Sequence, residues 1–279
     1  MFLPGVSSPC VRFPRSIPAR CLLLCSLLSS GAAVAQDVPG AAAIAQDVAA
    51  APVAGAPAST PEPRVLAPFV ATYQVFSDGR QLGDATMQLV RLDGARWRID
   101  LGMKGSGLLR VTGLNVQQST LFDSNGHDYR PLSQSTVRRV FLSSKKSTGI
   151  YDWSTHSARW TGDVKPSRRD PVALQDGDLS GLLIDLAVIR DAVPGKTLHY
   201  RFVEGGRARD HTYVVAPETE SIEVDGLSYD AMRVSREDGN DQTVVWVANG
   251  VPTPIRILQR EDGDDSTDLR LVEYKEAMQ

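Results

Sequence analysis

The sequence contains very little cysteine. Its three cysteines, Cys10, Cys21 and Cys25, all lie near the start of a chain of 279 residues, and the rest of the chain has none. Disulfide bonds, thiol nucleophiles and thiolate metal sites are therefore excluded after residue 25. The part of the chain beyond this point must be held together by its packed core.

Sequence signatures of catalysis are also missing. The chain has no G-x-S-x-G, no H-E-x-x-H and no Gly-rich phosphate loop. Its four histidines are scattered singly, at His127, His156, His199 and His211. We therefore predict that the protein is not an enzyme and has no catalytic residues, no metal site and no cofactor.

The N-terminal residues have the pattern of an export signal. Arg12, Arg15 and Arg20 precede the apolar run "CLLLCSLLSSGAAVA", and no acidic residue occurs before Asp37. The run ends in the small-x-small triplet of residues 33–35, which is typical of a cleavage site. We predict a signal peptide over residues 1–35, cleavage after Ala35 and a periplasmic location. The run is too short to span a bilayer, so we expect no transmembrane segment after cleavage.

Residues 36–65 are rich in alanine and proline and predict a flexible linker. Loss of the three arginines of the signal changes the formal net charge from −3 to −6. This acidic balance argues against a nucleic-acid partner.

Residues 66–279 predict a single β domain. The segment "FVATYQVF" (69–76) alternates apolar and polar residues, and further alternating segments follow at short intervals. Asn125-Gly126, Asp225-Gly226, Asp238-Gly239 and Asp262-Gly263 are dipeptides that favour tight hairpins. We predict a mainly β fold with a long, curved antiparallel sheet of about fourteen strands. The pattern leaves open whether this sheet is half-open or a closed, barrel-like structure.

One segment, near 178–192, has a helical period instead. Leucines and alanine recur three and four residues apart, Asp176 or Asp178 could cap the N-terminus, and Val193-Pro194-Gly195 ends the pattern. A helix that is apolar over most of its circumference is buried on several sides. It either lies inside the curve of the sheet or caps one end of a barrel. The candidate ligand-binding residues on it are Leu179, Leu183, Leu186 and Ala187.

Charge is distributed unevenly along the chain. Residues 138–169 carry eight basic side chains against two acidic ones, whereas residues 210–279 carry sixteen acidic and six basic ones. This predicts one basic and one acidic surface. Aromatic rings among the basic residues suit anionic lipid headgroups, glycans or a protein partner. Solvated outward faces with tryptophans in the core are the alternative. The candidate surface-interaction residues are Arg138, Arg139, Lys145, Lys146, Tyr151, Trp153, Arg168 and Arg169.

Several segments together resemble the bacterial exported family called domain of unknown function 3108. They are "FVATYQVFSDGRQLGDATMQL", "GIYDWSTHSARWTG", "DGDLSGLLIDLAVI", "PGKTLHYRFVEG", "VVWVANGVPTPIRILQREDG" and the closing "LRLVEY". The resemblance extends from about residue 66 to 275 and implies a periplasmic β domain with no agreed activity.

The sequence thus favours a non-catalytic binding or carrier module for an apolar or amphipathic ligand of the cell envelope, such as a lipid or acyl chain. Two alternatives remain. One is an envelope scaffold or protein-interaction domain with a packed interior, and the other is an enzyme that acts on glycans through carboxylates.

Overall fold

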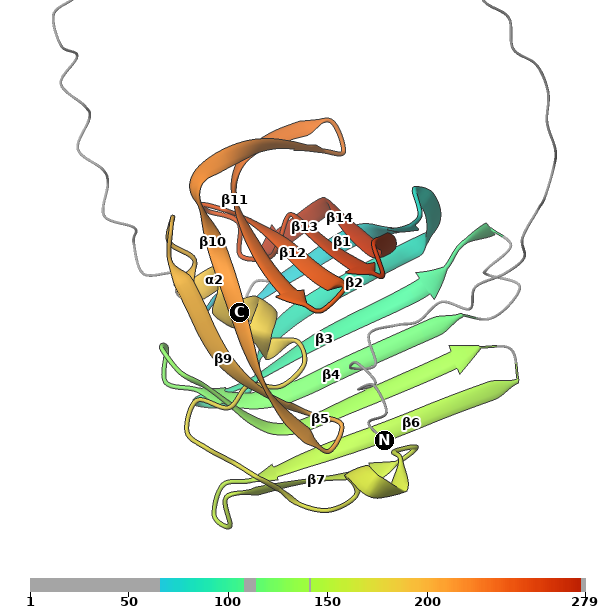
Figure 1. Cartoon of the computed structure of the whole chain (residues 1–279), viewed down its shortest axis with the longest axis vertical. Coiled ribbons are helices and arrows are strands. Elements are labelled where there is room, and N and C mark those ends of the chain that lie inside the picture. Colours follow the sequence, from blue (N-terminus) through green and yellow to red (C-terminus); the bar gives the residue numbers. More distant parts are fainter. Residues whose placement is uncertain (1–65, 108–113, 141, 277–279) are drawn as a thin grey trace, which may run out of the picture. The chain divides into compact units, whose positions relative to one another are not determined.

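The computed structural model describes residues 66–107, 114–140 and 142–276, which all belong to one compact unit (Figure 1). This described part of the chain contains fourteen strands, one α-helix and one 3₁₀ helix. The strands are β1 (Phe69–Ser77), β2 (Arg80–Arg91), β3 (Arg96–Gly105), β4 (Asn115–Ser124), β5 (Tyr129–Val140), β6 (Ser143–Asp152), β7 (Ser157–Gly162), β8 (Val172–Ala173), β9 (Thr197–Glu204), β10 (Arg207–Val224), β11 (Leu227–Asp238), β12 (Asp241–Ala248), β13 (Arg256–Glu261) and β14 (Asp264–Glu276). The helices are η1 (Pro166–Arg168) and α2 (Leu183–Asp191).

All fourteen strands form one antiparallel sheet. Its order is β8-β7-β6-β5-β4-β3-β2-β1-β14-β13-β12-β11-β10-β9. The first and last strands pair in the middle of the sheet, and the two strands at its ends, β8 and β9, follow one another in the chain. The predicted long antiparallel sheet is confirmed.

Three of the hairpin turns have the backbone conformation that their Asp-Gly sequences favour. In Asp78-Gly79, Asp225-Gly226 and Asp262-Gly263 both residues have positive φ, between 48° and 90°. This is the conformation of the two-residue turn whose twist suits a β-hairpin, and aspartate and glycine adopt it most easily. These dipeptides therefore set the register of the strands on either side.

One face of the sheet forms the core. In β1, the residues Phe69, Ala71, Tyr73 and Val75 are buried and alternate with half-buried neighbours. Helix α2 belongs to the same core, because six of its nine residues are buried against it. The helix therefore lies inside the curve of the sheet, as one of the two predicted placements requires (Figure 1).

The helix is shorter than the sequence predicts. The prediction of a helix near 178–192 is wrong at its N-terminal end, since α2 begins at Leu183 and its N-cap residue, Leu182, makes no side-chain capping hydrogen bond. The expected cap, Asp178, instead accepts a hydrogen bond from the Gln175 amide (2.8 Å) and pairs with Arg201. Pairing with β9 therefore holds residues 178–180 in an extended form.

The two ends of the sheet meet. Leu179 pairs in parallel with β9: its amide donates to the Arg201 carbonyl (2.9 Å), and the Val203 amide donates to the Leu179 carbonyl (2.8 Å). The Arg201 side chain also donates to the Ala173 carbonyl in β8 (3.1 Å). The sheet is therefore nearly closed and barrel-like. We call the contact between residues 173–182 and β9 the seam.

Candidate functional site

The inner face of the sheet changes from apolar to polar along a single row of residues. Cross-strand partners from β1 to β7 define this row. All of its members are buried. In order, they are Phe69, Leu89, Ile99, Thr120, Gln134, Gly149 and Trp160. The enclosed surface is thus apolar on β1–β3 and carries hydrogen-bonding groups on β4 and β5.

These polar groups continue across the seam. Gln134 donates through Nε2 to the Glu204 carboxylate in β9. The Tyr151 hydroxyl in β6 donates to the Val203 carbonyl (2.6 Å) and lies 3.3 Å from Gln134 Oε1. Two strands near one end of the sheet, β5 and β6, therefore contact β9 at the other end. Together with Ser180, we call Thr120, Gln134, Tyr151 and Glu204 the inner polar cluster.

Two hydroxyl groups of the inner polar cluster have no hydrogen-bond partner among the described residues. They are Thr120 Oγ1 and Ser180 Oγ, and both residues are fully buried. Gly181 lies beside them, because a Cβ placed on it would be 3.1 Å from Gln134 Nε2 and 3.7 Å from Thr120 Oγ1. Buried polar groups are nearly always satisfied in proteins, so a pair of unsatisfied hydroxyls calls for water or a ligand.

The cluster also holds a perturbed carboxyl group. Burial raises the pKa of Glu204 above its ordinary value, although the hydrogen bond from Gln134 and the positive charge of Arg209 act in the opposite direction. Burial and the nearby charges of Glu204 and Asp178 likewise raise the pKa of Tyr151, whereas the neighbouring Ser180 hydroxyl lowers it. Perturbed groups of this kind often mark functional sites, but ion-pair networks produce them as well.

A buried ion pair fixes the chain just before the cluster. The Asp178 side chain is fully buried and lies 2.6 Å from Arg201, whose side chain is 23% exposed. Both Asp178 oxygens accept hydrogen bonds from Arg201 Nη1. Because this pair sits at the seam, it holds Leu179 against β9 and Ser180 against the inner face.

Asp185 introduces a second carboxyl group inside the sheet. It lies in the first turn of α2, between buried residues, and burial raises its pKa to about 7. The residue nevertheless keeps an intermediate solvent exposure. Burial raises the pKa of Tyr73, and the charge of Asp185 adds to this rise. The Tyr73 hydroxyl donates a hydrogen bond to the Pro254 carbonyl at 2.9 Å.

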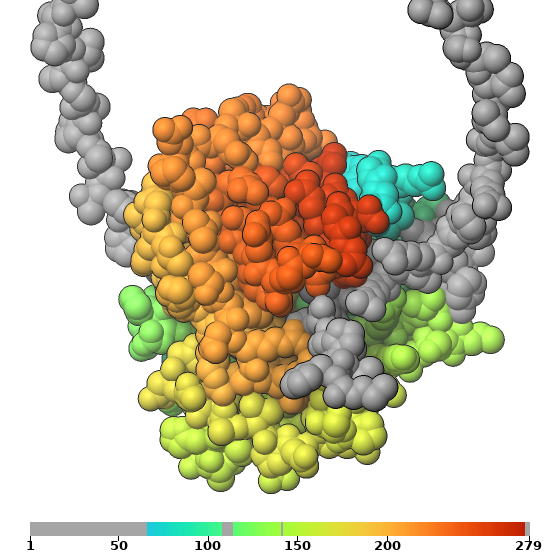
Figure 2. Space-filling model, in the orientation of Figure 1, coloured from blue at the N-terminus to red at the C-terminus, as the bar shows by residue number. Residues whose placement is uncertain are grey.

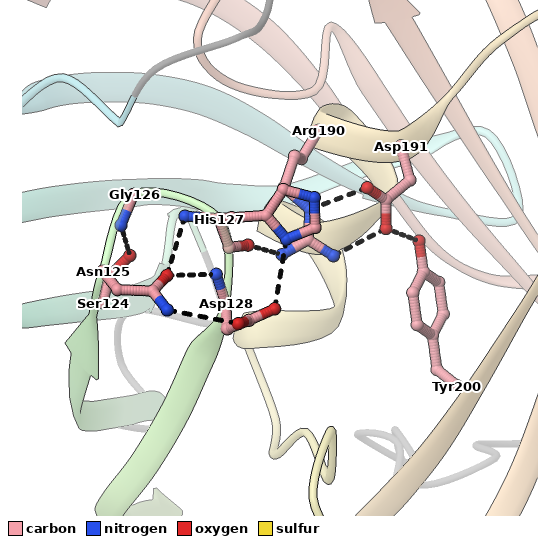
Figure 3. A network of polar contacts seen from close by, with 8 residues as sticks. All are labelled: Ser124, Asn125, Gly126, His127, Asp128, Arg190, Asp191 and Tyr200. Atoms are coloured by element: carbon pink, nitrogen blue, oxygen red, sulfur yellow. Dashed lines mark hydrogen bonds and ion pairs between the residues drawn. The ribbon is translucent and has the colours of Figure 1, made fainter.

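The far end of α2 is tied to the sheet by a separate network (Figure 3). Arg190 forms a bidentate pair with Asp191 (2.7 and 2.6 Å), and Tyr200 in β9 donates to the same carboxylate at 2.9 Å. Arg190 also donates to the His127 carbonyl in the β4–β5 turn and lies over the Tyr129 ring at 4.7 Å. The polar groups of this network bond to one another, so the network anchors the helix and does not form a ligand-binding site.

The only buried histidine in the described part of the chain is His211. It stacks on Phe202 at 4.8 Å, and neither ring nitrogen has a hydrogen-bond partner among the described residues. Burial, together with the charges of Arg236 and Arg209, lowers the pKa of His211 to about 4. The ring is therefore neutral near pH 7.

The structure places all four predicted ligand-binding residues in the core. Leu179 lies at the seam, and Leu183, Leu186 and Ala187 lie on α2; each is at most 4% exposed. The inner polar cluster beside them was not predicted. The sequence contains little that could predict this cluster, because its members come from five separate segments. Only the alternation of buried and exposed residues in β4–β6 could have placed three of them on the inner face.

The predicted surface residues divide into two groups. Arg139, Lys145, Lys146 and Arg169 are exposed, while Arg138, Trp153 and Arg168 are half-buried. The prediction that Tyr151 lies on the surface is wrong: it is 3% exposed and packs edge-on against Trp160 at 5.4 Å. Strand alternation explains the difference, since Tyr151 is on the inner face of β6 and its neighbours Ile150 and Asp152 are exposed.

The described part of the chain holds neither a metal-binding cluster nor a long apolar helix. No group of three or more His, Cys, Asp or Glu side chains in this part of the chain could hold a metal ion. In the same residues, no helix has the length and apolar character needed to cross a membrane. The predicted signal peptide (1–35) and linker (36–65) lie outside the described residues.

The fold and the inner face define a nearly closed, antiparallel β protein that encloses a helix and a partly polar interior. The chain belongs to the family described as protein of unknown function (DUF3108), which matches residues 70–270. Among solved structures, it is similar to the crystal structure of a β-barrel-like protein of domain of unknown function DUF1849 from Brucella abortus. The identity is 12%, the TM-score is 0.47, and the match covers 77% of this chain and 100% of that one. No curated protein matches the chain.

Proposed function

We propose that the protein is a non-catalytic binding or carrier module of the periplasm, and that its ligand is an apolar or amphipathic molecule of the cell envelope, such as a lipid or acyl chain. A curved sheet can hold such a ligand against its inner face. In this proposal, α2 covers part of that face and the ligand occupies space beside it.

The observation that carries the proposal is the polar end of the inner face. Thr120 Oγ1 and Ser180 Oγ are buried without partners, next to the apolar residues of β1–β3. An interior that served only as a packed core would gain stability from apolar residues at these places. An amphipathic ligand would place its polar group against the hydroxyls and its apolar part along β2 and β3.

Asp185 supports the same proposal. Its pKa shift requires dense protein surroundings, yet the residue remains partly accessible to solvent. This combination suits a side chain that faces water inside the curve of the sheet. The inner polar cluster also lacks the arrangement of a nucleophile, because Ser180 Oγ has no basic partner among the described residues. Binding therefore fits the cluster better than catalysis.

Ligand binding can be separated from stability at Thr120. We expect Thr120→Val to leave the melting temperature unchanged or slightly raised, because it replaces an unsatisfied hydroxyl with a methyl group of similar size. If the hydroxyl contacts a ligand, the same change should weaken binding of a fluorescent fatty acid severalfold. Thr86→Val, at an exposed position of β2, is the matched control and should change neither quantity.

The full-length protein, exported to the periplasm and purified, is the sample for this test. Native mass spectrometry and organic extraction should show a co-purifying lipid, and the fluorescent fatty acid should bind saturably with one-to-one stoichiometry. A folded protein that carries no lipid and binds no fatty acid would refute the proposal. That result would favour an envelope scaffold with a packed interior.

A further inference from the structure

The end of the β5–β6 hairpin combines basic and apolar residues in an exposed position. Val140 pairs with Ser143, so the strands are joined by only two residues. The second of these, Leu142, is fully exposed. Arg138, Arg139, Lys145 and Lys146 flank the turn, and residues 129–151 contain no acidic residue. We call the described residues of 138–146 the basic hairpin.

Turn geometry does not explain the apolar residue. Two-residue hairpin turns favour glycine, asparagine and aspartate, as the three Asp-Gly turns of this protein illustrate. Leu142 gains nothing from the core, because its side chain is exposed throughout. A residue that breaks a local rule without a structural benefit is often kept for function.

The basic residues surround the tip on both sides. In the pairing of β5 with β6, Arg138 lies opposite Lys145, and Arg139 and Lys146 lie on the other face of the two strands. Each face of the hairpin thus carries one arginine and one lysine. At roughly 3.3 Å per residue, these side chains begin within about 15 Å of the tip. Segments that lie in a membrane interface bury their apolar residues by about 5–10 Å, so Leu142 at the tip can enter the interface while the basic side chains stay near the headgroups.

Most of this positive charge is exposed to solvent. An acidic residue, Asp163, contacts the hairpin, where its carboxylate accepts a hydrogen bond from the Lys146 amide at 2.7 Å. Lys145, Lys146 and Arg139 all remain exposed. The hairpin end extends to the right-hand side of the view in Figures 1 and 2, away from the seam and from α2. It could therefore meet a flat surface without disturbing the inner face.

We propose that the basic hairpin docks the protein onto an anionic phospholipid bilayer. Leu142 enters the interface between headgroups and acyl chains, and the exposed side chains of Arg139, Lys145 and Lys146 contact lipid phosphates. This surface is distinct from the inner polar cluster, so the proposal does not depend on ligand binding inside the sheet. For a carrier, such docking would bring the protein to the source of its ligand.

Vesicle co-sedimentation of the full-length protein tests the proposal. Vesicles of phosphatidylcholine mixed with phosphatidylglycerol should bind the protein, and binding should fall as salt is added. Each basic residue near an anionic surface strengthens binding by roughly fivefold, so Lys145→Glu/Lys146→Glu should weaken it by about 25-fold or more. Leu142→Asp should also weaken it, with an unchanged melting temperature because the side chain makes no core contact.

The control is a double charge reversal elsewhere on the surface, Arg80→Glu/Lys196→Glu, at two exposed positions. It alters the net charge by the same amount and should bind as the wild type does. All proteins in the comparison carry the same N-terminal residues, so differences between them report on the substituted positions. Glycerol phosphate in solution should not compete.

Three results would overturn the proposal. The first is equal binding by wild type and Lys145→Glu/Lys146→Glu. The second is an equal loss in the control variant, which would show a response to net charge alone. The third is equal binding to vesicles of pure phosphatidylcholine.

Discussion

Asp185 offers a direct test of the electrostatics inside the sheet. It is an acidic residue in the first turn of a helix whose neighbours Leu183, Ile184, Leu186 and Ala187 are buried. Burial raises the pKa of Asp185 from 3.8 to about 7, and no charged partner opposes this shift. We predict that Asp185→Asn stabilises the protein at alkaline pH and has little effect at acidic pH.

The sign follows from proton binding. Between pH 4 and pH 7 the folded protein holds the Asp185 proton while the unfolded chain has released it. The contribution of Asp185 to the free energy of unfolding therefore falls as the pH rises through this range. It is lowest above pH 7. A shift of about three pH units corresponds to about 4 kcal/mol, which partial solvent exposure reduces. Asparagine avoids this cost because it is never charged.

The assay is urea unfolding of the full-length protein at pH 5 and pH 8. We expect the free energies of unfolding of Asp185→Asn and wild type to agree within about 1 kcal/mol at pH 5. At pH 8 the variant should be more stable by about 2–4 kcal/mol. Asp84→Asn, at an exposed position of β2, is the control and should show no such change with pH. The same difference at both pH values would refute the reasoning, since the carboxyl group would then not be held protonated by the fold.

Two further substitutions test packing and the seam. Gly149→Ala should destabilise the protein by about 1–3 kcal/mol in thermal unfolding, because the new Cβ would lie 2.4 Å from Trp160 Nε1, whereas Gly102→Ala meets no atom within 4 Å and should be nearly neutral. Arg201→Met should cost about 3–5 kcal/mol because it leaves the buried Asp178 carboxylate unpaired. Equal melting temperatures for Gly149→Ala and Gly102→Ala would contradict the tight packing against Trp160. An unchanged melting temperature for Arg201→Met would contradict the role of the buried ion pair.

The sheet could be predicted because its signals are local. The Asp-Gly turns and the alternation in β1 each depend on residues within a few positions of one another. The spacing of Leu183, Leu186 and Ala187 likewise predicts the helix from one short segment. Such patterns determine the strands and the helix, but they contain no information about how the sheet closes.

The start of α2 and the inner polar cluster depend on contacts between distant segments. The residues next to Asp178 in the chain predict a helix cap, but its partner Arg201 is 23 residues away. Gln134 and Glu204, 70 residues apart, meet only because the two ends of the sheet come together. The basic residues around Tyr151 suggested a surface position, whereas its partner Trp160 belongs to the inner face.

The pairing of β1 with β14 has a consequence for the order of folding. Phe69 pairs with Glu276, so the central pair of the sheet joins residues about as far apart as the domain allows. Strands β1–β8 and β9–β14 are each built from hairpins between neighbours in the chain, which form from local contacts. The two halves can join through this pair only when the last strand is present. During synthesis, the β1 edge of the N-terminal half therefore stays unpaired until β14 has been made, and an unpaired edge of this kind can associate with other strands.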